Sequence, residues 1–157
     1  MFQALRTVGE MSMSKITPCL WINVAPEAAV AYYTSIFPNV EASGINPMTG
    51  TIVIEGQRLQ LLNGGDMYKF NEAVSLVIAC KDQAEVDHYW DKLTADGGAE
   101  SKCAWCKDKY GLSWQVVPEA LVRFIGDPDR TKADRAVQAM LKMRKIVIAD
   151  LEKAFNG

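Results

Sequence analysis

Two segments of the sequence repeat the same order of features about 56 residues apart, and this repeat constrains the fold more than any other property. The apolar run Leu20–Val24 is followed by the aromatic pair Tyr32-Tyr33, and the run Leu76–Cys80 is followed by His88-Tyr89-Trp90. Short apolar runs are typical of buried strands, and the aromatic segments after them fit the buried face of a helix. The repeat therefore predicts an internal duplication whose copies each begin with a strand and a helix.

Each copy also contains a strand that follows a turn glycine. Gly56 precedes Gln60, and Gly111 precedes Gln115 by the same interval. Glycine suits such turns because it adopts positive φ without a steric penalty. We therefore expect the two glutamines to occupy matching positions in the two copies, and to face one cavity from opposite sides.

Alternation along the second of these strands separates its side chains into two groups. A period of two places Trp114 and Val116 on one face, and Ser113, Gln115 and Val117 on the other. A buried amide without partners costs about 1–3 kcal/mol, so an inward-facing glutamine needs something to bind. We expect Gln115 to face a cavity that holds a ligand or ordered water.

The predicted elements divide the chain into two modules and a tail. We expect an N-terminal extension over residues 1–13, a first module over about 14–63, a second over about 73–118 and a helical tail over 119–157. In the second module, Asp82 and Glu85 form a capping-box pattern, Gly97-Gly98 is expected to end the helix, and residues 100–105 are expected to form a strand. The tail contains amphipathic segments at 131–143 and 146–155, which we expect to pack on the sheet or on a partner subunit.

Composition excludes several classes of protein. The 157 residues are 49% hydrophobic and 23% charged, with a net charge of −2, which is ordinary for one globular domain and gives no reason to expect nucleic-acid or membrane binding. No apolar run approaches the length of a membrane span, and the first 13 residues lack the pattern of a signal peptide. We expect a cytoplasmic protein with four reduced cysteines, a disordered N-terminal extension, and a true start at Met1, Met11 or Met13.

Several stretches of the sequence together resemble one protein family. They are ITPCLW (Ile16–Trp21), AYYTSIFPN (Ala31–Asn39), LNGGDMYKFNEAVSLVI (Leu62–Ile78), DKYGLSWQVVP (Asp108–Pro118) and the tail segment Lys132–Phe155. They resemble the PhnB-like proteins, often described as 3-demethylubiquinone-9 3-methyltransferase domains, within the vicinal oxygen chelate superfamily of glyoxalases, bleomycin-resistance proteins and extradiol dioxygenases. The resemblance implies an α+β fold of two βαβββ modules that form a concave mixed sheet, followed by the helical tail. It also implies a homodimer.

The resemblance further indicates where a metal would bind. Metal-dependent members of the superfamily place ligands on the first and last strands of the modules, including a glutamate four residues after the turn glycine. Those positions correspond here to Gln60 and Gln115 on the last strands, and to residues 17–19 and 74–75 on the first. None of them is His or Glu, and neutral amides are poor ligands for a divalent metal. We therefore expect a degenerate metal site and no cofactor.

Two other motifs could carry chemistry, and each has a simpler interpretation. His88, the only histidine, is either a catalytic base or a solvated helix residue. Cys103 and Cys106 form a lone C-x-x-C, which is either a redox or metal pair or two unrelated thiols. The simpler interpretation is favoured for both, because neither motif has the partners that its chemistry requires.

The candidate ligand cavity combines amides with aromatic walls. Its expected residues are Gln60, Gln115, Ser75, Trp21 and Cys19, with Trp105 and Phe70 near the mouth. Such a lining suits a small, flat, partly polar ligand, whereas the alternative is that the aromatic residues are core and the glutamines bond to each other.

Three functions follow from these expectations. We favour binding of a small molecule of unknown identity. A metal-dependent lyase, isomerase or dioxygenase is the second, and the family label alone would indicate a methyltransferase. The third is an interaction protein that oligomerises through its helical tail.

Overall fold

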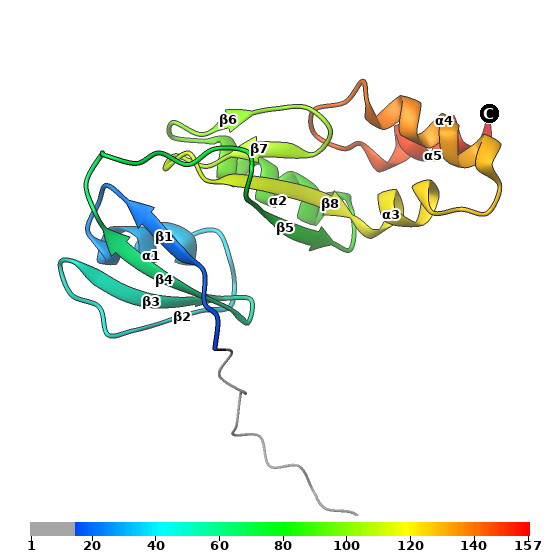
Figure 1. The fold of residues 1–157 in the computed structure, drawn as a ribbon. Coiled ribbons are helices and arrows are strands. Elements are labelled where there is room, and N and C mark those ends of the chain that lie inside the picture. Colours follow the sequence, from blue (N-terminus) through cyan, green and yellow to red (C-terminus); the bar gives the residue numbers. More distant parts are fainter. Residues whose placement is uncertain (1–14) are drawn as a thin grey trace, which may run out of the picture.

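The computed structural model describes residues 15–157, so the expectations for the N-terminal extension lie outside the described residues. Two modules of similar construction are followed by three helices (Figure 1). The first module contains β1 (Cys19–Ile22), α1 (Pro26–Thr34), β2 (Val40–Ser43), β3 (Thr49–Ile54) and β4 (Gln57–Asn63). The second contains β5 (Ser75–Cys80), α2 (Gln83–Thr94), β6 (Ala99–Glu100), β7 (Trp105–Lys107) and β8 (Ser113–Pro118). The tail contains α3 (Glu119–Ile125), α4 (Arg130–Met140) and α5 (Ile148–Asn156).

The two modules have the same topology. Each forms a four-stranded sheet, with strand orders β1-β4-β3-β2 and β5-β8-β7-β6. In each sheet the first strand pairs in parallel with the last, and the remaining pairs are antiparallel. This is the βαβββ arrangement twice over, so the predicted fold class is confirmed, and the two copies indicated by the repeat have the same topology.

Local sequence signals explain where several elements begin and turn. Pro26 is the first residue of α1. A backbone N–H at this position would have no partner within the helix, so proline costs no hydrogen bond there. The Asp82 side chain accepts a hydrogen bond from the Glu85 backbone N–H, and the Glu85 carboxylate accepts one from the Lys81 N–H. The hairpin between β3 and β4 turns at Glu55 and Gly56, which both have positive φ.

The second module departs from the predicted elements at two places. Helix α2 ends at Thr94 with an extended cap at Ala95, so Gly97-Gly98 lies in the turn that follows and does not cap the helix. Residues 100–105 do not form one strand, because Cys103 and Ala104 have φ values of 56° and 73° and break the chain into β6 and β7. Residues other than glycine rarely adopt positive φ, and nothing in the sequence of residues 100–105 indicates that two of them do so here.

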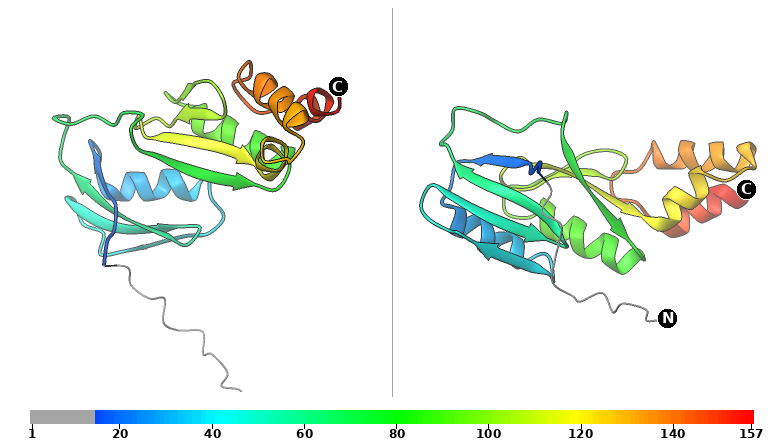
Figure 2. Two further views of the ribbon diagram at one scale, coloured as in Figure 1. Left: turned by 45° about the vertical axis from the view of Figure 1, so that its right-hand side comes forward. Right: turned by 60° about the horizontal axis from the view of Figure 1, so that its bottom comes forward.

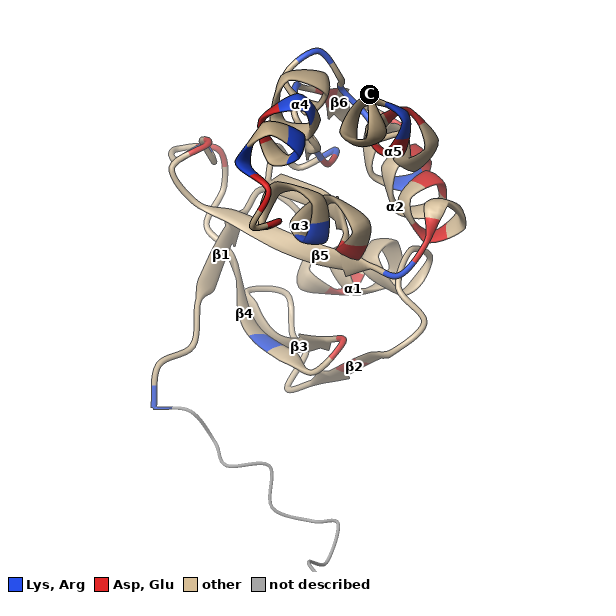
Figure 3. Ribbon diagram, turned by 90° about the vertical axis from the view of Figure 1, so that its right-hand side faces the viewer, with Lys and Arg blue, Asp and Glu red and all other residues tan. Residues whose placement is uncertain are grey.

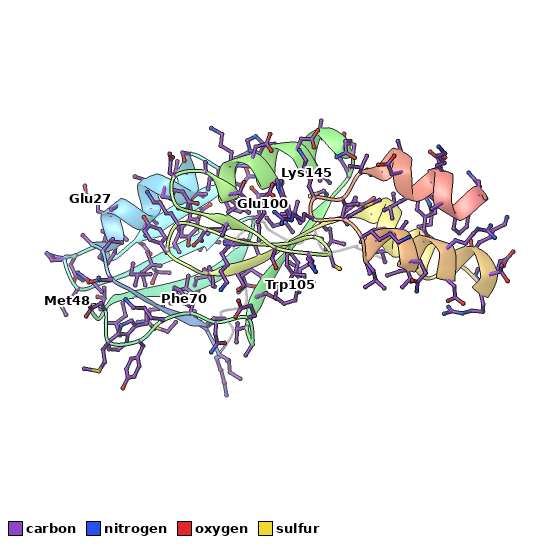
Figure 4. All side chains as sticks on the ribbon, turned by 90° about the horizontal axis from the view of Figure 1, so that it is seen from above. Glu27, Met48, Phe70, Glu100, Trp105 and Lys145 are labelled. Carbon is purple, nitrogen blue, oxygen red and sulfur yellow. The ribbon has the colours of Figure 1, made fainter. Side chains whose placement is uncertain are left out.

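The helix-bearing sides of both sheets contribute to one hydrophobic core. Leu20, Ile52 and Leu61 from the first sheet belong to the same cluster as Val116 and α2 residues from the second. Figure 4 shows α1 and α2 on the same side of the molecule, with the strands below them. Each sheet therefore has a second side that faces away from its helix, and this side is called the open face below.

The tail helices cover the end of the second module at which β8 stops (Figure 2). Their own core joins α3, α4 and α5 through Leu121, Ala136 and Leu151, and it includes Ala104 from the turn before β7. The backbone N–H groups of Cys103 and Ala104 donate to the carbonyls of Met143 and Arg144. The strained turn thus anchors the tail to the sheet.

Side chains of α2 also bind the tail, at the segment between α4 and α5. The Gln83 side-chain amide donates to the Ile146 carbonyl and accepts from the Ile148 N–H, at 3.0 and 2.8 Å. The Lys145 ammonium pairs with Asp87 and Asp91 of α2, and Figure 3 shows the charged residues of α2, α4 and α5. Within residues 15–157, no helix combines the length and the apolar character that a membrane span requires.

Candidate ligand-binding face

The open face of the second sheet carries Gln115 and the residues around it. The alternation predicted for β8 is correct, because Trp114 and Val116 are buried in the core and Gln115 is half-buried on the other side. The cross-strand neighbours of Gln115 are Val77 on β5 and Trp105 on β7. The sheet therefore places an amide between an indole ring and an aliphatic side chain, on an accessible surface.

A hydrogen bond links Gln115 to Ser75. The Gln115 Nε2 atom donates to Ser75 Oγ at 2.9 Å. Since the serine oxygen accepts this bond, its own O–H remains able to donate, and the Gln115 carbonyl oxygen accepts from no described residue. Ser113, the neighbour of Ser75 across the sheet, is fully buried with no partner for its hydroxyl among the described residues. The face thus presents a donor and an acceptor close together on adjacent strands.

The structure places Gln60 in the other sheet. It is exposed on the open face of the first sheet, where its cross-strand neighbours are Cys19 and Thr51. Cys19 is also exposed. Gln60 and Gln115 occupy matching strands of the two modules, as the duplication predicts, but they have different neighbours in two separate sheets.

Trp21 and Phe70 lie at a third position. The Trp21 indole N–H donates to the Gly65 carbonyl at 2.9 Å, and its ring meets Tyr68 edge-on at 4.8 Å. A Cβ at Gly64 would collide with the indole, so this glycine is required for close packing of the loop. Trp21 and Phe70 line a hollow of about 250 Å³ near the DKYG turn. The seven predicted cavity residues are thus distributed over three places. Gln115, Ser75 and Trp105 lie together on the second sheet, Gln60 and Cys19 on the first, and Trp21 and Phe70 beside this hollow.

Sequence reasoning missed the role of Asp108. Its carboxylate is 1% exposed and accepts four hydrogen bonds, from Tyr33 Oη, Trp114 Nε1 and the backbone N–H groups of Tyr110 and Leu112. Burial raises the pKa of the Asp108 carboxyl, and these four donors oppose that rise. The Asp-x-Tyr-Gly turn was visible in the sequence, but the bond from α1 of the first module was not.

The two motifs with alternative interpretations have structural explanations. The His88 Nε2 atom lies 2.8 Å from the Ile36 carbonyl, so it carries the proton and donates to the first module. His88 is exposed, as the simpler interpretation expects, and it also makes a contact between the modules. Cys106 is buried, and burial raises its pKa to about 12, while Cys103 belongs to the strained turn. All four cysteines are free thiols in the structure.

The comparison with protein families identifies the chain. A family model described as 3-demethylubiquinone-9 3-methyltransferase matches residues 14–117. The chain belongs to this family. The match covers both βαβββ modules of this PhnB-like chain and ends at β8, so the tail helices lie beyond it.

Several solved structures are similar to this chain. The PhnB protein from Bacillus cereus is 26% identical with a TM-score of 0.59, and the match covers 66% of this chain and 98% of that one. Protein PA1353 from Pseudomonas aeruginosa is 18% identical with a TM-score of 0.53, covering 66% and 96%. The fosfomycin resistance protein FosX from Listeria monocytogenes, solved with Mn(II) and sulfate, is 14% identical with a TM-score of 0.49, covering 65% and 87%. The search of curated proteins found no match.

The residues of this PhnB-like chain fit poorly to the metal that the superfamily implies. Its positions on the first and last strands carry a thiol, a hydroxyl and two amides, namely Cys19, Ser75, Gln60 and Gln115. Within residues 15–157, no three His, Cys, Asp or Glu side chains are grouped so that they could hold a metal ion. Three of these four groups are neutral oxygen or amide donors, which bind a divalent cation weakly, and only Cys19 could become an anionic ligand.

Proposed function

We propose that this PhnB-like protein binds a small, partly polar organic molecule on the open face of its second sheet. The observation that carries the proposal is the hydrogen bond between Gln115 and Ser75. It fixes the amide so that its carbonyl oxygen and the serine O–H remain available side by side.

The surroundings of this pair supply apolar contact area. Trp105 lies beside Gln115, and Val77 and Ala79 extend the face along β5. Val77 is 62% exposed and adds apolar area to this surface. A few polar groups within an apolar surface are the composition of small-molecule sites in general.

A second copy of the chain would complete the site. The open faces belong to two separate sheets, and both are accessible in one chain. A homodimer that brings the Gln60 face of one copy against the Gln115 face of the other would bury Val77 and the ligand together. Light scattering over a range of concentrations tests this proposal, and a mass that stays monomeric at high micromolar concentration contradicts it.

The binding proposal is tested by ligand screening with matched variants. Thermal shift identifies stabilising fragments, which are then titrated against Gln115→Leu and against the control Gln138→Leu, an equally conservative change on the exposed side of α4. We expect the stabilisation to fall in the first variant and to persist in the second. A fragment whose stabilisation survives in a Gln60→Leu/Gln115→Leu double variant would place binding elsewhere and refute the proposal.

We further propose that the protein works without a resident transition metal. The support for this proposal is that two amides and a hydroxyl are neutral ligands, so at most one thiolate could offset the charge of a divalent cation. Elemental analysis of protein purified without a tag decides the matter. Near-stoichiometric metal that disappears in Gln115→Ala would show that the amide is a ligand.

A further inference from the structure

A hollow of about 480 Å³ lies between the two modules, at the β5 edge of the second sheet. The hairpin of the first module lines one side, and the second module contributes five successive β5 residues, 75–79, together with residues of α2 and β8. Successive residues of a strand point to opposite faces, so a hollow that touches all five lies along the edge of the strand. Strand β5 is the outermost strand of its sheet, and no described residue pairs with this edge.

We propose that this hollow binds a small protonated amine with an apolar body. The size of the hollow falls within the range of small-molecule sites, which is roughly 300–1,000 Å³. The hollow shares Ser75, Val77 and Ala79 with the open face, but Gln115 and Trp105 do not line it. The proposal does not depend on the function proposed for that face.

The charges around the hollow have one sign. Its lining residues include the carboxylates Glu55 and Glu85 and no Lys, Arg or His. The Glu85 carboxylate is partly neutralised by the Lys81 ammonium at 3.2 Å, whereas no described cation lies within ion-pair distance of Glu55. Burial raises the pKa of the Tyr89 hydroxyl, and the two carboxylates raise it further, which indicates a negative potential inside the hollow.

Glu55 has an unusual backbone conformation, and hydrogen bonds hold its carboxylate in place. It has a φ of 47° in the hairpin turn, a conformation that glycine and asparagine adopt more readily. Its two carboxylate oxygens accept from Asn39, one from the backbone N–H at 2.9 Å and one from the side-chain amide at 3.0 Å. These bonds fix the carboxylate in place and leave lone pairs on both oxygens for a further donor. The hairpin thus holds an uncompensated anion at the entrance of the hollow.

The interior of the hollow is apolar. Phe37 stacks on Tyr89 with 5.2 Å between ring centroids and lies 5.4 Å from the Trp114 ring, and Ile54 and Leu59 form the adjoining wall. The edge of β5 adds backbone carbonyls that can accept from an ammonium group. A ligand with an apolar body and a positive end can pack against the apolar walls and pair with the carboxylates at the entrance.

Three probes of similar shape and different charge test the proposal. They are 2-phenylethylamine, 2-phenylethanol and phenylacetate, each titrated by calorimetry and by amide chemical-shift mapping. We expect the amine to bind about tenfold more tightly than the alcohol at low salt, with phenylacetate weakest, because the carboxylates act at short range across the hollow. The preference for the amine should shrink as salt screens this attraction.

Substitutions test whether the probes bind in the hollow or elsewhere on the surface. Glu55→Gln should weaken binding of the amine about fivefold and leave binding of the alcohol unchanged. The matched control is Glu41→Gln, because Glu41 lies on the exposed open face of the same sheet. Gln57→Trp, an exposed position at the rim, should obstruct all three probes without disturbing the core. Gln115→Leu should change nothing. Equal binding of the three probes, or amine binding that is insensitive to Glu55→Gln and Gln57→Trp, would overturn the proposal.

Discussion

The buried Asp108 carboxylate gives the sharpest prediction about how the two modules are joined. Replacing Asp108 with Ala leaves four donors without their acceptor, namely Tyr33 Oη, Trp114 Nε1 and two backbone N–H groups. An unsatisfied buried donor costs about 1–3 kcal/mol, and removing a desolvated charge returns part of that sum. We expect Asp108→Ala to lower the free energy of unfolding by about 3–5 kcal/mol, which is a large share of the ~5–15 kcal/mol available to a typical domain.

A double-mutant cycle isolates the bond between the modules. Tyr33→Phe removes one hydroxyl from the carboxylate and should cost about 1.5–3 kcal/mol, the usual value for a hydrogen bond to a charged group. The same change made in the Asp108→Ala background should cost under about 0.5 kcal/mol, because the acceptor is already absent. Tyr68→Phe serves as control, since Tyr68 is 61% exposed. The assay is urea unfolding followed by tryptophan fluorescence, and costs that simply add would refute the claim that Asp108 binds α1 to the second module.

Three further predictions concern the tail, acid stability and the thiols. Gln83→Ala should cost about 1–2 kcal/mol and increase hydrogen exchange in α5 while the sheets keep their protection, because its side chain bonds the segment that enters this helix; unchanged exchange would show that the apolar contacts suffice. The hydrogen bond from Lys145, with one from Gln83, lowers the pKa of Asp87, so its contribution to stability is present above the usual aspartate pKa and is lost as the pH falls through the lowered value; Lys145→Met should raise the Asp87 pKa in a carboxyl NMR titration, and an unmoved pKa would refute the pairing. Burial raises the pKa values of Cys80 and Cys106 to about 12, so both should resist thiol reagents until the protein unfolds, when a count of four free thiols is expected; a count of two, restored by reductant, would contradict this.

Local patterns were sufficient to predict the architecture of the modules. The repeat of strand, aromatic helix and turn glycine fixed the duplication, because a βαβββ unit is specified by short-range periodicity and by turns. Alternation placed Trp114 in the core and Gln115 on the opposite face, and both positions are as predicted. The capping pattern at Asp82 likewise forms the bond that its spacing indicates.

Only the tertiary structure determined how the two modules pack against each other. Gln60 and Gln115 match by duplication, yet sequence cannot say whether two matching faces meet within one chain, since that depends on how the modules pack. Here they pack through their helix-bearing sides, which joins Phe37 to Tyr89 and Tyr33 to Asp108 over long sequence separations. The same packing leaves the open faces accessible and creates the acidic hollow beside β5. These features arise from contacts between distant segments, for which the sequence carries no local signal.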